Sequence, residues 1–469
     1  MKPSDLKPAY DIAVIGAGPA GMAAATLTAR AGLATVLLDE NGAPGGQIYR
    51  AVTTTPVVRR EVLGSDYWRG EELIGELAAS GAELATGALV WSLSRELEIG
   101  VSIAGVSRML SARRVIVATG ALERPYPIPG WTLPGVMTAG GAQTLLKASG
   151  LIPSGRVVLA GAGPLLWLLA GQLLRAGARI ACILDTTSVG NYLRALPHLP
   201  AFLLSPYLTK GLALMAEARG VKVVRGVSGL AALGGNALGE VIFRTRKGEQ
   251  RLACDHLLLH QGLAANVNLA MAAGIPHRWD PGQLCWLPEL DGLGNSALPG
   301  IAVAGDGARI AGARVAEERG RLAARAAIAA LAGGRREGHQ LRVNLRALAG
   351  YARGRAFLDA LYRPARASRL PAGDATVVCR CEEVTAGEIR DCVRQGCAGP
   401  NQLKAFLRCG MGPCQGRLCG LTVTELIAEC TGRGPQEVGY FRLRPPVKPI
   451  ALGELAALPE PQAAARPRP

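Results

Sequence analysis

The sequence predicts an α/β protein with two Rossmann-like dinucleotide-binding domains and a small helical domain near the C-terminus. Two glycine-rich turns, beginning at Gly16 and Gly161, each lie between an apolar run and a helical pattern. Eight of the eleven cysteines fall in the short stretch from Cys379 to Cys430. The turns indicate two nucleotide-binding units. The crowded cysteines indicate a separate module.

The first unit begins with the apolar run Ile12–Ile15, which is typical of a buried parallel strand. After it, Gly16 makes the tight turn, Gly18 lets the backbone approach a pyrophosphate, and Gly21 lets helix and strand pack closely. The helix N-terminus offers free N–H groups to phosphate. The next strand ends in Asp39, where a carboxylate accepts ribose hydroxyls. Strand, glycines, helix, strand and acid in this order predict a bound dinucleotide.

Composition limits the classes of function. The 469 residues suffice for two or three domains. A net charge of +16 would suit nucleic acid, but only eight of the 52 basic residues are lysines and the arginines are spread evenly. This pattern indicates a compositional bias, so no nucleic-acid partner is expected.

Two uncharged runs of 18 residues, 12–29 and 157–174, have the length of membrane spans. Each contains a Gly-x-Gly turn, which favours a buried strand followed by part of a helix. No hydrophobic signal segment precedes the first strand. We therefore expect a cytoplasmic protein, in which a dense group of cysteines indicates metal rather than disulfides.

Three further motifs follow in a fixed order: Gly45-Gly46-Gln47, Ala118-Thr119-Gly120 after an apolar strand, and Ala304-Gly305-Asp306 after another. With them, the chain resembles the two-dinucleotide-domain flavoproteins related to glutathione and thioredoxin reductases. The resemblance implies FAD contacts from Gly16, Gly18, Gly21, Asp39, Gly46, Gln47, Thr119, Gly120, Gly305 and Asp306. In that family the final aspartate holds the ribityl chain of the flavin.

Two departures from that family affect the expected chemistry. The chain has no Cys-x-x-Cys pair, which argues against disulfide reduction. Arg309 stands where we expect a glycine, close to the predicted flavin contacts.

The second unit contains Gly161, Gly163 and a terminal Asp185, which would favour NAD over its 2′-phosphate analogue. The third glycine is replaced by Leu166, which crowds the helix–strand contact and the approach of a pyrophosphate. A retained structural domain with altered or no nucleotide binding is the favoured interpretation. A second nucleotide, NAD or another, is the alternative.

The cysteine module starts with Cys379-Arg-Cys381, and the pair Thr385 and Glu388 has the spacing of a capping box, which predicts a helix just after it. Further helices are expected over 401–408 and 418–429. Three short helices bury little surface, so a metal centre would supply the missing stability.

The best set of four ligands is Cys379, Cys381, Cys409 and Cys414. Four thiolates suit zinc or an iron–sulfur cluster. The absence of Cys-x-x-Cys knuckles favours [2Fe–2S]. Cys419 is a possible substitute ligand, whereas the remaining cysteines of the module are expected to serve in packing.

The run Cys-x-Cys-Glu-Glu-Val-Thr, followed by Cys-Gly-Met-Gly-Pro-Cys-Gln-Gly-Arg, looks like a bacterioferritin-associated-ferredoxin-type [2Fe–2S] domain. It resembles the form fused to the larger flavoprotein subunit of opine oxidases, D-hydroxyproline dehydrogenases and hydrogen cyanide synthase. The resemblance spans about residues 11–455. It implies that a smaller FAD-dependent, amino-acid-oxidase-like subunit oxidises the substrate and that this chain carries the electrons onward. It is compatible with a third, small subunit and with at most peripheral association at the inner face of the membrane.

The expected domain boundaries follow from these motifs. A helix is expected over 341–362 within the linker, and 459–469 is expected to be a disordered tail. The ranges are 1–150 for the first part of the FAD-binding domain, 151–275 for the second Rossmann-like domain, 276–335 for the return of the FAD-binding domain, 336–373 for a linker, 374–440 for the [2Fe–2S] domain and 441–469 for a C-terminal tail.

Three functions compete on this sequence. The favoured one is an electron-transfer subunit with FAD and [2Fe–2S] in a heteromeric amino-acid or opine (secondary amine) dehydrogenase or oxidase. The alternatives are a self-sufficient NAD(P)H-dependent FAD/iron–sulfur reductase and a non-catalytic scaffold that binds zinc. None of the five histidines falls in a motif with a partner base, so no catalytic residue is assigned.

Overall fold

The first sheet carries the first glycine turn at its centre. The computed structural model describes residues 5–332 and 337–458. The strand order is β3-β2-β1-β6-β5-β4, and β19 also pairs with β6. These strands are β1 (Ala9–Ile15), β2 (Thr35–Asp39), β3 (Glu83–Thr86), β4 (Ala88–Leu93), β5 (Glu98–Ile103), β6 (Val106–Val117) and β19 (Ile301–Val303). Pairing is parallel from β3 to β6 and at β19, so the carboxyl ends of these strands meet at one edge.

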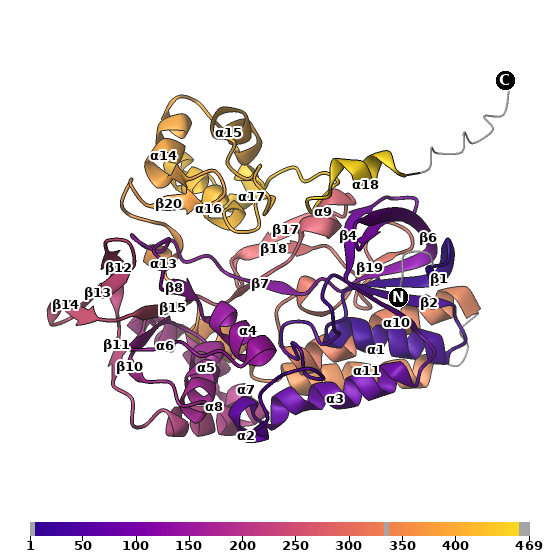
Figure 1. Cartoon of the computed structure of the whole chain (residues 1–469), viewed down its shortest axis with the longest axis horizontal. Coiled ribbons are helices and arrows are strands. Elements are labelled where there is room, and N and C mark those ends of the chain that lie inside the picture. The colour runs from indigo at the N-terminus through magenta and orange to yellow at the C-terminus, as the bar shows by residue number, and fades with distance from the viewer. Residues whose placement is uncertain (1–4, 333–336, 459–469) are drawn as a thin grey trace.

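The two faces of β1 are buried in different cores, as expected for a central parallel strand. Ile12 and Val14 pack towards the helical side, and Ala13 and Ile15 pack towards the side that includes β4 and β5. Helices α1 (Pro19–Arg30) and α10 (Ala313–Ala332) cover the helical side, with α3 (Ser65–Ala78) next to α1. Their arrangement below the sheet is visible in Figure 1.

The second sheet holds the second glycine turn and is parallel throughout, in the order β11-β10-β9-β15-β8. The elements of this part are β8 (Val136–Thr138), α4 (Ala139–Ser149), β9 (Val157–Gly161), α5 (Pro164–Arg175), β10 (Ile180–Asp185), α6 (Val189–Ala195), α7 (Leu199–Leu203), α8 (Pro206–Glu217), β11 (Val223–Arg225) and β15 (His256–His260). Helices α7 and α8 lie at the bottom of the view, opposite the C-terminal helices, whereas α4 lies near the middle of the molecule (Figure 1).

Short antiparallel pieces connect the two sheets and extend them. Strands β7 (Ala121–Glu123) and β16 (Leu263–Ala265) pair where the chain passes between the sheets. The remaining elements are α2 (Arg60–Leu63), the meander of β12 (Ser228–Gly234), β13 (Leu238–Thr245) and β14 (Gly248–Ala253), the helix α9 (Asn268–Ala272), and the pair β17 (His277–Asp280) and β18 (Cys285–Pro288).

The helix expected over 341–362 is present as two helices, α11 (Glu337–Ala352) and α12 (Arg355–Leu361). The break falls at Gly354, whose φ of +81° ends the helical path. Helix α11 packs on α10, where the Asn344 side chain donates to Glu318 Oε2 over 2.8 Å. This part of the expected linker is therefore bound to the body of the protein.

The C-terminal helices form the top of the molecule in Figure 1. The capping box predicted at Thr385 and Glu388 is present at the start of α14. Ion pairs of Arg366 and Arg369 in α13 with Glu429 and Glu425 hold α13 against α16. The elements are α13 (Arg366–Arg369), β20 (Val377–Cys379), β21 (Val384–Thr385), α14 (Ala386–Arg394), α15 (Pro400–Leu407), α16 (Gly420–Thr431) and α17 (Pro435–Val438).

The chain after α17 returns to the first sheet. Val447 is buried and its N–H donates to Trp91 O over 2.9 Å, and α18 (Leu452–Ala456) packs near β6. The tail expected over 459–469 lies outside the described residues. Within the described ranges, no single helix is long and apolar enough to cross a membrane; the bent pair Val189–Leu203 and Pro206–Glu217 passes by length and composition alone.

Candidate flavin site and cysteine centre

The first glycine turn has the shape that a dinucleotide requires. Gly18 precedes α1, and an added Cβ there would meet no atom closer than Gly46 Cα at 3.9 Å. At Gly21 an added Cβ would lie 1.8 Å from Gly16 O, so only glycine lets α1 pack this closely. The buried Asp39 accepts a hydrogen bond from Ala17 N–H over 2.5 Å, which places its carboxylate beside the turn.

The segment from Gly45 to Tyr49 lies directly on this turn. Gly45 N–H donates to Ala17 O over 2.8 Å. At Gly46, φ is +60° and an added Cβ would approach Gly18 Cα to 2.8 Å. Two glycines therefore face each other with backbone only, which leaves N–H groups accessible and fits a pyrophosphate. Gln47 follows in the same segment, as the flavoprotein resemblance implies.

The other predicted contacts gather at the same edge of the first sheet. Ala118 N–H donates to Ile15 O over 2.8 Å, which sets Thr119 and Gly120 next to the turn. Thr119 Oγ1 donates to Asn266 O over 3.2 Å, and Asn266 N–H donates to Gly120 O over 3.0 Å. The carboxyl edge of a parallel sheet is the usual position of a bound nucleotide.

The last flavin motif lies after β19. Gly305 sits so close to α1 that an added Cβ would be 2.8 Å from the Ala20 Cβ. Asp306 Oδ1 accepts hydrogen bonds from Ala311 N–H and Gly312 N–H, over 2.9 and 3.2 Å, and so shapes the turn before α10. A contact of Asp306 with a ribityl chain stays a prediction.

Arg309, which replaces the expected glycine, does not disturb this turn. Its guanidinium donates to Asp280 Oδ2 on β17 over 2.9 Å. This ion pair provides a structural reason for an arginine at the position.

The second glycine turn keeps two of its three glycines, but the backbone at Gly163 has a φ of +130°, whereas the equivalent Gly18 of the first turn has a φ of −75°. Leu166 is 1% exposed and packs in the core below α5. Helix α6, the helix after β10, is held against the end of α12, because Asn191 Nδ2 donates to Leu361 O and Arg363 O over 3.0 and 2.8 Å.

We expect NADH not to bleach the flavin of the isolated protein, because the buried Leu166 side chain replaces the glycine that lets helix and strand pack closely in a nucleotide-binding turn. Stopped-flow absorption after mixing with NADH, without oxygen, measures this directly. Dithionite is the control for a reducible flavin. Rapid bleaching by NADH would contradict the expectation and favour the self-sufficient reductase.

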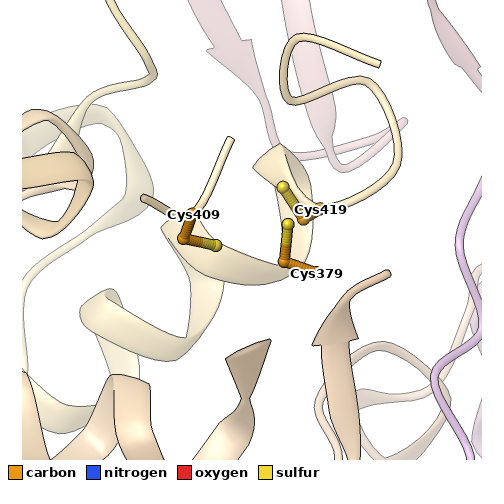
Figure 2. A group of neighbouring side chains, drawn as sticks. All are labelled: Cys379, Cys409 and Cys419. Atoms are coloured by element: carbon orange, nitrogen blue, oxygen red, sulfur yellow. The ribbon is translucent and has the colours of Figure 1, made fainter. Parts of the chain in front are cut away.

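Five cysteines lie at or after the end of β20 and between α15 and the start of α16. The sulfur atoms of Cys379, Cys409 and Cys419 lie within 4.8 Å of one another, and all three side chains are buried (Figure 2). Sulfurs around one tetrahedral metal at about 2.3 Å are about 3.8 Å apart, so this spacing fits a metal centre. Cys381 and Cys414 are half-buried and hydrogen-bond to each other through their side chains.

Hydrogen bonds favour a negative charge on one sulfur of this group. The thiols of Cys409 and Cys419 donate to Cys379, and so do the backbone N–H groups of Gly410 and Glu382. They hold the pKa of the Cys379 thiol far below its usual range, while the pKa of Cys409 is raised. Backbone N–H groups aimed at sulfur are the surroundings that iron–sulfur clusters use.

Aromatic side chains cover the cysteine loop, and glycines make room for them. An added Cβ at Gly410 or Gly416 would lie 2.6 Å from the Phe441 ring, and at Gly420 it would lie 2.2 Å from Tyr440 Oη. The loop also contacts the flavin-binding body, because Asn268 Nδ2 donates to Gln415 O over 3.0 Å. Asn268 lies two residues after Asn266, so one short segment contacts both candidate sites.

Two of the four predicted ligands, Cys379 and Cys409, lie in the buried triad with Cys419, which the sequence offers only as a substitute ligand, while Cys381 and Cys414 pair with each other. The choice of four among these five thiols stays a prediction. Sequence reasoning missed Lys147, which is buried beside the Gly45–Tyr49 segment. The sequence contained a hint of a special role for Lys147, because it is one of only eight lysines and follows Gln143 by one helical turn.

The fold and the first site define an oxidoreductase built on two dinucleotide-binding domains. Residues 10–327 match the family described as pyridine nucleotide-disulphide oxidoreductase, and residues 374–458 match the sarcosine oxidase A3 domain. The chain belongs to this oxidoreductase family, and within it to the group that includes subunits of opine oxidase and of hydrogen cyanide synthase. Membership implies FAD binding.

The similarity to these relatives extends over nearly their whole length. A subunit of opine oxidase from Agrobacterium tumefaciens (strain Ach5) is 47% identical over 468 residues, which cover 97% of this chain and 93% of the relative. The HcnB subunit of hydrogen cyanide synthase from Pseudomonas aeruginosa is 34% identical over 462 residues, with 93% and 96% covered. The solved L-proline dehydrogenase from P. horikoshii matches with a TM-score of 0.73 at 20% identity, over 95% of this chain and 79% of that one. The predicted family and fold class are confirmed.

Proposed function

We propose that the chain is the FAD- and [2Fe–2S]-containing electron-transfer subunit of a heteromeric amino-acid or opine (secondary amine) dehydrogenase or oxidase. The observation that carries the proposal is the group of buried thiols, Cys379, Cys409 and Cys419, packed directly on a flavin-binding body. An iron–sulfur cluster supplies one-electron transfer when bound, and a flavin can exchange one or two electrons. Two such sites in one chain suit a relay of electrons.

The ligands proposed for the cluster are Cys379, Cys381, Cys409 and Cys414. The flavin contacts proposed are the ten residues named above at the carboxyl edge of the first sheet. For the chain's own residues, the roles are to bind and orient: the facing glycines expose backbone N–H groups, and Asp39 presents a carboxylate to the ribose. The buried Phe441 ring covers the glycines on one side of the cysteine loop.

The heteromeric part of the proposal rests on the relatives, whose names describe them as subunits. A smaller FAD-dependent, amino-acid-oxidase-like subunit is the proposed partner and the site of substrate oxidation. Two of the five histidines have partners within the fold. His260 is tied to Glu123 by a 2.5 Å contact, and His277 Nδ1 contacts Ile275 O, so both serve the fold.

We expect the chain, purified free of other polypeptides, not to oxidise a secondary-amine or opine-type substrate. The assay uses an artificial dye as acceptor and a panel of such substrates. Co-expression with the proposed smaller subunit serves as the positive control. In that preparation, dye reduction with substrate should exceed dye reduction without substrate. Substrate-dependent dye reduction by the chain alone would contradict the proposal.

A further inference from the structure

Helix α4 presents a lysine to the flavin segment from the interior of the protein. Lys147 is 3% exposed, and its ammonium donates to Gln47 O, Ile48 O and Gln143 Oε1 over 3.1, 2.9 and 2.9 Å. Gln143 Nε2 in turn donates to Gln172 Oε1 over 2.8 Å, which links this lysine to α5. The ammonium has three donors and three acceptors, so its hydrogen bonding is complete.

The positive charge of Lys147, in contrast, has no negative partner among the described residues. Its three acceptors are neutral, and no carboxylate pairs with it among the residues that the structure describes. The nearest charge is the cation of Arg50, and the Tyr67 ring centroid lies 5.6 Å from Nζ. Burial, together with Arg50, lowers the pKa of Lys147 to about 7. A buried cation without an anion is costly, so an anion from outside the chain would be favoured here.

The carbonyl groups that Lys147 binds belong to the segment that rests on the glycine turn. Gly46 in that segment lies against the backbone of Gly18, beside the proposed pyrophosphate position. A flavin dinucleotide brings two phosphate charges to such a turn. The phosphates of a bound flavin dinucleotide would therefore supply the negative charge that the buried Lys147 lacks.

We propose that Lys147 is a positioning residue of the flavin site: its ammonium holds the Gly45–Tyr49 segment on the glycine turn, and bound FAD offsets its charge. The inference rests on FAD binding at the first glycine turn. Helix α4 packs with the second sheet, yet the proposal gives it a role in retaining the flavin bound at the first sheet.

The variants Lys147→Met and Lys147→Arg test this on the full chain, with FAD removed and titrated back. Methionine fills the same space without the charge, so the apoprotein should unfold at the same temperature or higher. Its dissociation constant for FAD should nevertheless rise about 10- to 100-fold, because hydrogen bonds from a charged group are lost. Lys210→Met, an exposed lysine paired with Asp66, is the matched control and should leave FAD binding unchanged.

The pH profile separates this role from a structural one. The neutral amine keeps only two N–H donors and turns a lone pair towards the third oxygen, so the dissociation constant should rise as pH increases from 6 to 9. In Lys147→Arg the cation persists at every pH in this range, and the profile should be flat. The other groups that face the ammonium do not titrate here, because Arg50 stays charged and the pKa of Tyr67 is raised to about 12.

Unchanged FAD affinity in a folded Lys147→Met protein would overturn the proposal. A dissociation constant for FAD that still rises with pH in Lys147→Arg would also overturn it. This second test does not require the methionine variant to fold. Failure of the wild-type chain to bind FAD would instead refute the flavin site itself.

Discussion

Replacing Cys379 with serine is expected to abolish the iron–sulfur absorption of the protein and to remove its iron. Cys379 lies at the centre of the buried thiols and receives hydrogen bonds from two thiols and two backbone N–H groups. Serine keeps the size but is a poor ligand for iron, which prefers thiolate sulfur. Iron should fall from about two atoms per chain to background. Visible absorption and iron and sulfide analysis of anaerobically purified protein provide the measurement.

Two other cysteines of the module serve as matched controls. Cys430 is exposed, and Cys392 in α14 hydrogen-bonds to Cys397 and is not part of the buried triad. Their serine variants should keep the full iron content. A zinc site would add no visible absorption to that of the flavin in any variant, because zinc is colourless, and would contradict the cluster.

The fourth ligand is decided by a second pair of variants, Cys414→Ala and Cys419→Ala. The sequence places Cys414 in the ligand set, whereas the structure places Cys419 within 4.8 Å of Cys379 and Cys409. If Cys414→Ala kept full iron and sulfide while Cys419→Ala lost them, the proposed ligand set would be wrong.

Local patterns were sufficient for much of this fold. The run from Ile12 to Asp39 carries local signals for a strand, a glycine turn, a helix and a second strand. The structure has β1, α1 and β2 at these positions. The capping box at Thr385 and Glu388 needs contacts only within one turn, and α14 starts there. Such features are visible because the residues that determine them are neighbours in sequence.

Features that depend on contacts between distant residues could not be predicted from the sequence with the same certainty. The helical pattern continues across Gly354, and its break accompanies packing of the residue against Ser205, where an added Cβ would approach Oγ to 2.6 Å. Cys419, which the sequence offers only as a substitute ligand, lies within 4.8 Å of both Cys379 and Cys409. Lys147 meets Gln47 across 100 residues of chain. Each of these contacts is made by tertiary packing, for which single-sequence patterns carry little signal.

Valine at Gly18 is expected to leave a folded protein that has lost its FAD, whereas valine at Gly21 is expected to prevent folding. Gly18 has a φ of −75°, which any residue adopts, and the nearest atom to an added Cβ is 3.9 Å away. The valine methyl groups therefore fit the apoprotein but occupy the space over the turn where a pyrophosphate approaches. FAD should fall from about one per chain to below about one tenth.

At Gly21 the same side chain cannot fit. An added Cβ would lie 1.8 Å from Gly16 O and 3.4 Å from the Val14 side chain, so α1 would have to leave β1. Overpacking of this kind in a central contact should cost more than about 3 kcal/mol of the free energy of unfolding. Circular dichroism with thermal unfolding measures the fold of both variants, and flavin absorption relative to protein measures FAD. A folded Gly18→Val protein with full FAD would refute the proposed role of this turn. A Gly21→Val protein as stable as the wild type would show that α1 does not pack on β1 as described.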